Sequence, residues 1–137
     1  MVKPKVMIGD VRRTSPVWLG TRFFETHIAI PGGIGVDTTG MTPDDKGKIM
    51  LPSGTVLGQT FAEYQNGDLL GLAADGDQFI TILIHDLKNA LEDPYGAGLR
   101  PASGNSVYYN FLPDWDTLAA AVQNLVFQNF NCVRGRL

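Results

Sequence analysis

The chain has 137 residues, enough for one domain with a modest core, and its 44% of hydrophobic residues excludes an intrinsically disordered protein. No apolar run approaches the ~20 residues of a membrane helix, and residues 1–5 lack the apolar stretch of a secretory signal, so we expect a soluble protein with no membrane partner. The net charge of −3 is unevenly distributed: residues 1–30 have five basic and two acidic groups, whereas residues 31–137 have six basic and twelve acidic groups. The acidic remainder argues against nucleic acid as the main partner, because phosphate binding needs concentrated Lys and Arg.

Residues 1–35 have no sustained hydrophobic period, and prolines interrupt them at positions 4, 16 and 31. Their aromatic residues are interspersed with arginines, which leaves two interpretations open: a strand set into the core, or an extended arm docked on a partner. We favour the arm, because its basic charge differs from that of the acidic body. The candidate contact residues are Arg12, Arg13, Trp18, Arg22, Phe23 and Phe24. Residues 32–35 read Gly-Gly-Ile-Gly without a following Lys-Ser or Lys-Thr pair, so we interpret them as a flexible junction rather than a phosphate loop.

Residues 36–137 are expected to form the body. After a polar loop over residues 36–47, apolar runs predict strands over residues 48–51, 55–62, 69–73, 78–85, 107–112 and 127–133. Pro52-Ser53-Gly54 predicts a tight turn, the Asn66-Gly67 pair predicts a hairpin turn over residues 64–68, and a further turn is expected at residues 74–77. A strand spacing of about 8–12 residues favours a small β-barrel or β-sandwich over alternating βαβ units. Residues 87–104 show no regular pattern.

One helix is predicted over residues 117–128, with Asp114 or Asp116 as its cap. Its apolar residues recur on one face at helical spacing, which is typical of core packing; they are Leu118, Val122, Leu125 and Val126. The expected fold is therefore a mainly β body with one short C-terminal α-helix and an extended N-terminal arm.

Catalytic and metal-binding signatures are weak. His85 and Asp86 resemble a base beside its orienting carboxylate, but neighbouring strand residues point to opposite faces and no Gly-x-Ser-x-Gly nucleophile turn is present. The two histidines lack the spacing of a zinc site, and Asp75-Gly76-Asp77 is too short for a calcium loop. We therefore expect no enzyme, no cofactor and no metal.

Two further features bear on partners. Cys132 is the only cysteine, and we interpret it as a small buried hydrophobe, with a disulfide to a second chain left open. Tyr108, Tyr109 and Trp115 form our second-choice interface after the arm, because aromatic residues are enriched at the cores of protein interfaces.

The order of these elements resembles a known family. Lys48-x-x-Leu51-Pro-Ser-Gly-Thr-Val-Leu-Gly58 resembles the Gly-Thr-Val-Leu-Gly stretch of phage head decoration proteins of the lambda protein D type. Such chains continue with an Ala-Ala-Asp-Gly turn, like residues 73–76, and an apolar strand, like residues 80–84. A distal strand and a short helix complete the order, and residues 107–112 and 117–128 match them. The likeness covers residues 38–133.

The resemblance implies a small β-rich body, often trimeric, on the outside of a phage head in the virion, made in the host cytoplasm. Such a cement protein clamps neighbouring major capsid protein subunits after expansion of the shell and has no catalytic activity. The N-terminal arm of the family contacts the capsid protein, which would give residues 1–35 a role. The chain departs from the pattern in its long segment over residues 87–104. The alternative function is a carbohydrate- or receptor-binding β module of a tail or fibre, because aromatic residues and turn-rich loops suit sugar stacking.

Overall fold

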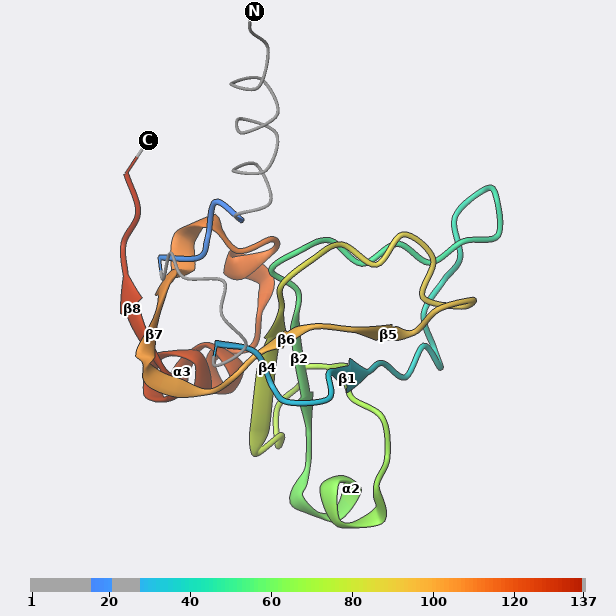
Figure 1. The fold of residues 1–137 in the computed structure, drawn as a ribbon, viewed down its shortest axis with the longest axis horizontal. Helices are drawn as coiled ribbons and strands as arrows, with labels where there is room; N and C mark the ends of the chain where they lie inside the picture. The colour runs from blue at the N-terminus through green and yellow to red at the C-terminus, as the bar shows by residue number, and fades with distance from the viewer. Residues whose placement is uncertain (1–15, 21–27, 137) are drawn as a thin grey trace, which may run out of the picture.

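The computed structural model describes residues 16–20 and 28–136 of the chain (Figure 1). Its strands are β1 (Ile34–Gly35), β2 (Val56–Gln59), β3 (Gly71–Leu72), β4 (Phe79–Leu83), β5 (Tyr95–Gly96), β6 (Gly98–Leu99), β7 (Ala102–Tyr108) and β8 (Phe130–Val133). Its helices are α2 (Phe61–Asn66), α3 (Ala120–Asn129) and the short 3₁₀ turns η2 (Tyr109–Phe111) and η3 (Trp115–Thr117). The predicted mainly β fold with a short helix near the C-terminus is confirmed.

The strands form a central sheet and two smaller ones. The central sheet has the order β3-β2-β4-β6 and is antiparallel, β1 pairs with β5, and β7 pairs with β8. Within the described residues no sheet closes into a barrel. In Figure 1, β7, β8 and α3 lie together on one side of the central strands, while β1, β5 and the long loops lie on the other side.

The central sheet is buried on both faces because its inner strands alternate between two clusters of apolar side chains. Val56 of β2 and Ile82 of β4 face the first core cluster, whereas their neighbours Leu57 and Leu83 face the second. Leu57, Ile82 and Leu83 are each fully buried. The run of apolar residues in β4 therefore reflects burial on both faces, as in the centre of a layered domain.

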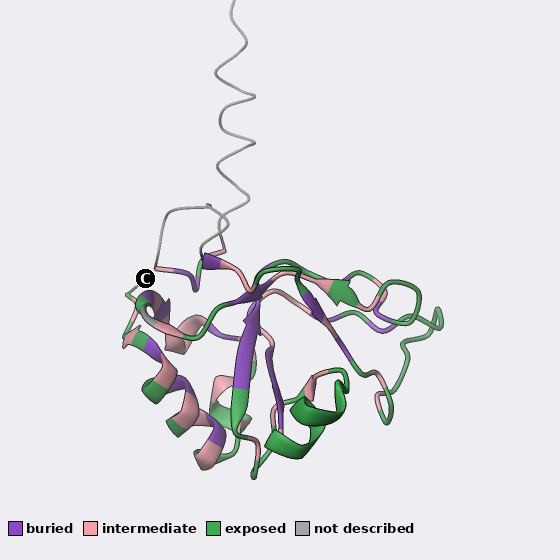
Figure 2. Cartoon of the chain, turned by 60° about the horizontal axis from the view of Figure 1, so that its bottom comes forward, coloured by how far each residue is buried: buried purple, intermediate pink, exposed green. Residues whose placement is uncertain are grey.

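The first core cluster lies between the central sheet and the layer made by α3, β7 and β8. α3 contributes Val122 and Val126, both fully buried, and its outer face is exposed (Figure 2). Val107 of β7 and Phe130 of β8 complete this layer. β7 and β8 are parallel, so α3 lies in a crossover between them. The strand spacing favoured a barrel or sandwich over alternating βαβ units, and this parallel pair with its crossover helix differs from that expectation.

Residues 16–20 and 28–35 pack on the body rather than forming part of an extended arm, and the rest of the arm predicted over residues 1–35 lies outside the described residues. Leu19 bridges Val107, and the Gly20 N–H donates to the Ser106 carbonyl at 2.8 Å, so this segment lines the free edge of β7. The Ile30 N–H donates to the Gly98 carbonyl at 2.8 Å, which places residues 28–30 along β6. The physical reason is that both edges offer unpaired backbone groups and an adjoining apolar core. Residues 31–32 make a turn into β1, closed by a 3.0 Å hydrogen bond from the Gly33 N–H to the Ile30 carbonyl.

Several predicted boundaries shift. The predicted strand over residues 55–62 ends at Gln59, and α2 begins at Phe61. The predicted hairpin turn at Asn66-Gly67 is the end of that helix, with Gly67 at φ 76°. Of the predicted strand over residues 48–51, only Leu51 pairs, through a bridge to Leu87. The irregular segment over residues 87–104 contains β5, β6 and the start of β7.

The C-terminal elements also differ in detail. β7 ends at Tyr108, and residues 109–112 turn away from the strand predicted there. The predicted helix over residues 117–128 is α3, which begins at Ala120 with Ala119 as its N-cap, so neither Asp114 nor Asp116 caps it. The final predicted strand is β8, shorter at its start because α3 continues to Asn129.

Candidate functional site

The most conspicuous exposed surface of the described chain is built on α2, a helix that the sequence analysis missed. Its N-terminus carries a capping box, in which the Thr60 hydroxyl accepts the Glu63 N–H at 3.2 Å and the Glu63 carboxylate accepts the Thr60 N–H at 2.8 Å. The Phe61 N–H also donates to the Gln78 side chain at 2.8 Å. Because no residue of α2 is buried, these caps rather than core packing hold the helix.

Three aromatic side chains gather on this helix and the adjoining strand, and we call them the α2 aromatic patch: Phe61, Tyr64 and Phe79. The ring of Phe79 lies 5.0 Å from that of Tyr64 and 6.1 Å from that of Phe61, measured between centroids. Their exposed fractions are 47% for Phe61, 59% for Tyr64 and 40% for Phe79. Rings of this size are usually buried, so their common exposure marks a surface suited to a partner.

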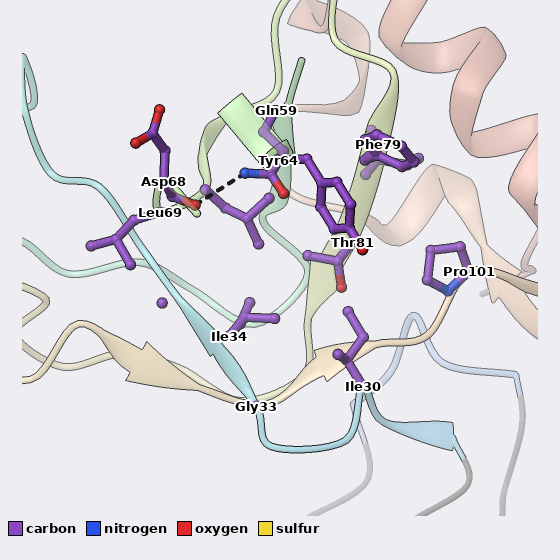
Figure 3. A pocket seen from close by; sticks show the side chains of 13 residues that line it. Ile30, Gly33, Ile34, Gln59, Tyr64, Asp68, Leu69, Phe79, Thr81 and Pro101 are labelled. Carbon is purple, nitrogen blue, oxygen red and sulfur yellow. Dashed lines mark hydrogen bonds between the residues drawn. The ribbon is translucent and has the colours of Figure 1, made fainter. Parts of the chain in front are cut away.

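A groove of about 340 Å³ lies beside the α2 aromatic patch, and we call it the α2 groove. Figure 3 shows Tyr64 and Phe79 along one side of it, with Ile30 and Ile34 across from them and Leu69 at its end. Its two buried polar side chains are already paired: Gln59 donates to the Asp68 carbonyl at 3.1 Å, drawn as a dashed line, and Thr81 donates to the Leu99 carbonyl at 2.8 Å. The groove therefore offers mainly apolar side chains to an occupant.

The second-choice interface predicted from the sequence is only partly brought together. The ring centroids of Tyr109 and Trp115 lie 5.3 Å apart, and Phe127 of α3 joins them at 5.2 Å and 5.6 Å. Tyr108 instead packs against Phe111, at 5.9 Å. The sequence pattern of residues 108–115 does not reveal Phe127, because this ring comes from α3, a later helix that folds against the segment.

Trp18 was predicted as an anchor for a partner, and this prediction is wrong. Its side chain is 2% exposed and belongs to the first core cluster. Its indole N–H donates to the Ser53 hydroxyl at 3.0 Å, a partner that only the folded chain supplies. The other predicted contact residues lie outside the described residues; they are Arg12, Arg13, Arg22, Phe23 and Phe24.

The turn at Ser53 joins three parts of the chain. The Ser53 hydroxyl donates to the Ile84 carbonyl, and the Ser53 N–H donates to the Asp86 carboxylate at 2.6 Å. Asp86 therefore has a structural role in fixing the turn. Its neighbour His85 is exposed, two residues after the end of β4.

The titratable groups of the described residues supply little chemistry. No group of three or more histidine, cysteine or acidic side chains within residues 16–20 and 28–136 could hold a metal ion. Burial raises the pKa of the Cys132 thiol, which lies 3.4 Å from the Val126 carbonyl oxygen. Hydrogen bonds from the Thr39 side chain and backbone lower the pKa of the exposed Asp37 carboxyl group.

Comparison with protein-family models, with curated proteins and with solved structures found no match to this chain. None of the helices in the described part is long and apolar enough to cross a membrane. The features that bear on function are therefore the surfaces described above and the motif over residues 48–58.

Proposed function

We propose that this chain is a decoration protein that cements the major capsid protein subunits of a phage head. The observation that carries the proposal is the α2 aromatic patch beside the α2 groove. Three exposed rings and an apolar hollow on a small domain are typical of a surface that a protein partner covers. Aromatic side chains that enter a partner's pockets also supply much of the binding energy at such interfaces.

The phage class is proposed from the motif that resembles lambda protein D, and in the fold the glycines of this motif have structural roles. Gly54 has φ 95°, and a Cβ there would lie 2.7 Å from Pro113 and 3.0 Å from Trp18. Gly58 passes so close to Asp77 that a Cβ would lie 2.6 Å from its carboxylate. The motif builds the centre of the body, and the contact surface is assigned to α2.

The acidic side chains near the α2 aromatic patch indicate which kind of capsid segment would bind there. Acidic Glu63 lies in the first turn of α2, Asp68 lines the α2 groove, and the last turn of α2 has no basic residue. A capsid segment with an apolar anchor flanked by Lys or Arg would complement this surface. Binding to the capsid would therefore come from apolar contacts at the centre and from attraction between opposite charges around them. Salt screens this attraction, so binding would weaken at high salt.

The experiment that tests the proposal uses expanded heads that lack the protein, prepared from the phage whose genome carries this sequence. Purified full-length chain should co-sediment with these heads and raise the temperature at which they release DNA. A chain that neither co-sediments with the heads nor changes that temperature would exclude the proposed function. A Tyr64→Ser variant should bind more weakly, whereas a Tyr95→Ser variant should bind normally, because Tyr95 is exposed at β5, outside the patch.

The resemblance implies a trimer. A trimer would present three copies of the α2 aromatic patch to one site of the shell. Each additional copy would raise the effective concentration of the others near the capsid, so the assembly would bind far more tightly than one subunit. Sedimentation equilibrium of the free protein and of the same protein released from heads would measure the number of chains.

A further inference from the structure

A second hollow lies away from the α2 groove, where the two 3₁₀ turns meet the C-terminal segment after β8. We call it the Trp115 hollow, and its volume is about 530 Å³. This size is within the range of about 300–1,000 Å³ that is typical of small-molecule sites. The side chains that matter for the argument are Tyr109, Asp114, Trp115, Asp116, Thr117 and Arg134.

Hydrogen bonds within the protein hold the walls of the Trp115 hollow in place. The Asn110 side chain donates to the Gly135 carbonyl at 3.0 Å and accepts the Gly135 N–H at 2.6 Å, which ties the C-terminal segment to η2. Thr117 donates to the Asp114 carbonyl through its N–H and its hydroxyl, at 3.0 Å and 2.8 Å. Gln123 of α3 donates to the Trp115 carbonyl at 2.8 Å. A ligand would thus meet a preformed site and would lose little affinity in ordering it.

Polar groups of the hollow remain available for a ligand. Asp114 has φ 57° and ψ 26°, and it is the only non-glycine residue with positive φ in the described chain. Its carboxylate makes no capping hydrogen bond to η3. Within the described part of the chain, neither Asp116 nor Arg134 has a side-chain hydrogen bond or ion pair. Two carboxylates and one guanidinium therefore face solvent around an aromatic wall.

We propose that the Trp115 hollow binds a neutral saccharide. Carboxylates accept hydrogen bonds from sugar hydroxyl groups, and a guanidinium donates to hydroxyl oxygens, so both charges suit hydroxyl-rich ligands. The C–H face of a pyranose carries slight positive charge and packs against the electron-rich face of an indole or phenol ring. Because the hollow has two carboxylates and one guanidinium, its net charge is negative and it disfavours anionic sugars such as uronates.

This site is separate from the α2 groove and does not depend on the proposed capsid contact. On a decorated head it would leave an exposed saccharide-binding site on each subunit. Many weak copies arranged on one shell would bind a surface polysaccharide through multivalency. The proposal adds a binding activity to the structural role.

The test follows the two tryptophan indole signals in proton–nitrogen correlation spectra of the full-length protein. Trp18 lies in the core and reports on folding, whereas Trp115 lines the hollow. The probes are hexasaccharides of glucose, galactose, mannose and N-acetylglucosamine, with a galacturonate hexasaccharide as the anionic comparison. At least one neutral probe should move the Trp115 signal saturably and leave the Trp18 signal in place, and galacturonate should bind more weakly.

Two exposed substitutions then connect the binding to the hollow. Asp116→Ala and Arg134→Ala should each lower the affinity for the responding probe by about tenfold, because each removes a charge-assisted hydrogen bond. Tyr95→Ser at β5, an exposed residue that lines neither the Trp115 hollow nor the α2 groove, is the matched control and should leave the affinity unchanged. The proposal is overturned if no neutral probe moves the Trp115 signal, if galacturonate binds as tightly as the neutral probes, or if both hollow variants keep full affinity.

Discussion

The indole N–H of Trp18 donates a hydrogen bond of 3.0 Å to the hydroxyl of Ser53, across 35 positions of sequence. The Ser53 hydroxyl in turn donates a hydrogen bond to the carbonyl of Ile84, the residue that follows β4. The buried indole of Trp18 thus connects residues 16–20 to the turn over residues 52–54, which lies within the motif over residues 48–58. Because the indole is buried and the Ser53 hydroxyl is partly buried, losing either partner leaves a polar atom poorly satisfied.

Replacing Trp18 by phenylalanine should therefore destabilise the fold. Trp18→Phe retains an aromatic ring but removes the donor and leaves a small void, so the free energy of unfolding should fall by about 2 kcal/mol. Urea denaturation followed by far-ultraviolet circular dichroism measures this change. Tyr95→Phe, at an exposed position, is the control and should change stability little. An unchanged midpoint for Trp18→Phe would show that this hydrogen bond does not support the fold.

The glycine at the corner of the same turn allows a sharper comparison. Gly54 and Gly76 have nearly the same φ, 95° and 97°, but a Cβ would meet Pro113 and Trp18 at Gly54 and nothing within 4 Å at Gly76. Gly76→Ala should cost about 1 kcal/mol from the strained backbone alone. Gly54→Ala should cost at least about 2 kcal/mol more, because the core must also shift. Equal losses in urea denaturation would contradict the close packing at Gly54.

The capping box of α2 predicts a local effect. Thr60→Ala removes the hydroxyl that accepts the Glu63 N–H and should destabilise α2 by about 1 kcal/mol. Since α2 has no buried residue, this loss should appear as faster amide exchange within residues 61–66, with little change in the central sheet. Hydrogen exchange followed by mass spectrometry measures it. Thr60→Ser keeps a hydroxyl and should behave as the wild type. If amide exchange within residues 61–66 is as slow in Thr60→Ala as in the wild type, contacts other than this cap hold the helix.

Cys132 predicts a pH dependence. Burial raises the pKa of its thiol, so at a given pH the folded protein has less of the reactive thiolate than the unfolded chain. Alkylation by iodoacetamide should therefore rise at higher pH in the folded protein than in the same protein denatured by urea. Mass spectrometry of the alkylated fraction at a series of pH values gives both curves. Coincident curves would show that the folded environment does not disfavour the thiolate.

Local sequence patterns predicted the elements that local chemistry determines. The turn over residues 74–77 forms as expected, with the Asp77 carboxylate accepting the Ala74 N–H at 2.9 Å. β4 follows from its run of apolar and β-branched residues, and α3 follows from the spacing of Val122 and Val126. Each of these depends on residues close together in the chain.

The remaining features depend on contacts between distant residues. The position of Trp18 is decided by Ser53 and by the free edge of β7, and neither is visible in the pattern of residues 1–35. The parallel pairing of β7 and β8 requires α3 to cross between them, which strand spacing alone does not reveal. The sequence does carry a signal for α2, because Thr60-x-x-Glu63 is a capping box signature, although the apolar run over residues 55–62 favours a strand there.

Electron cryo-microscopy of expanded heads decorated with the full-length protein tests the central claim most directly. The account predicts density for this fold on the outer surface of the shell, with Tyr64 and Phe79 of the α2 aromatic patch in contact with capsid subunits and with each body touching more than one subunit. Heads that carry no such density, or bodies whose α2 faces away from the shell, would contradict it.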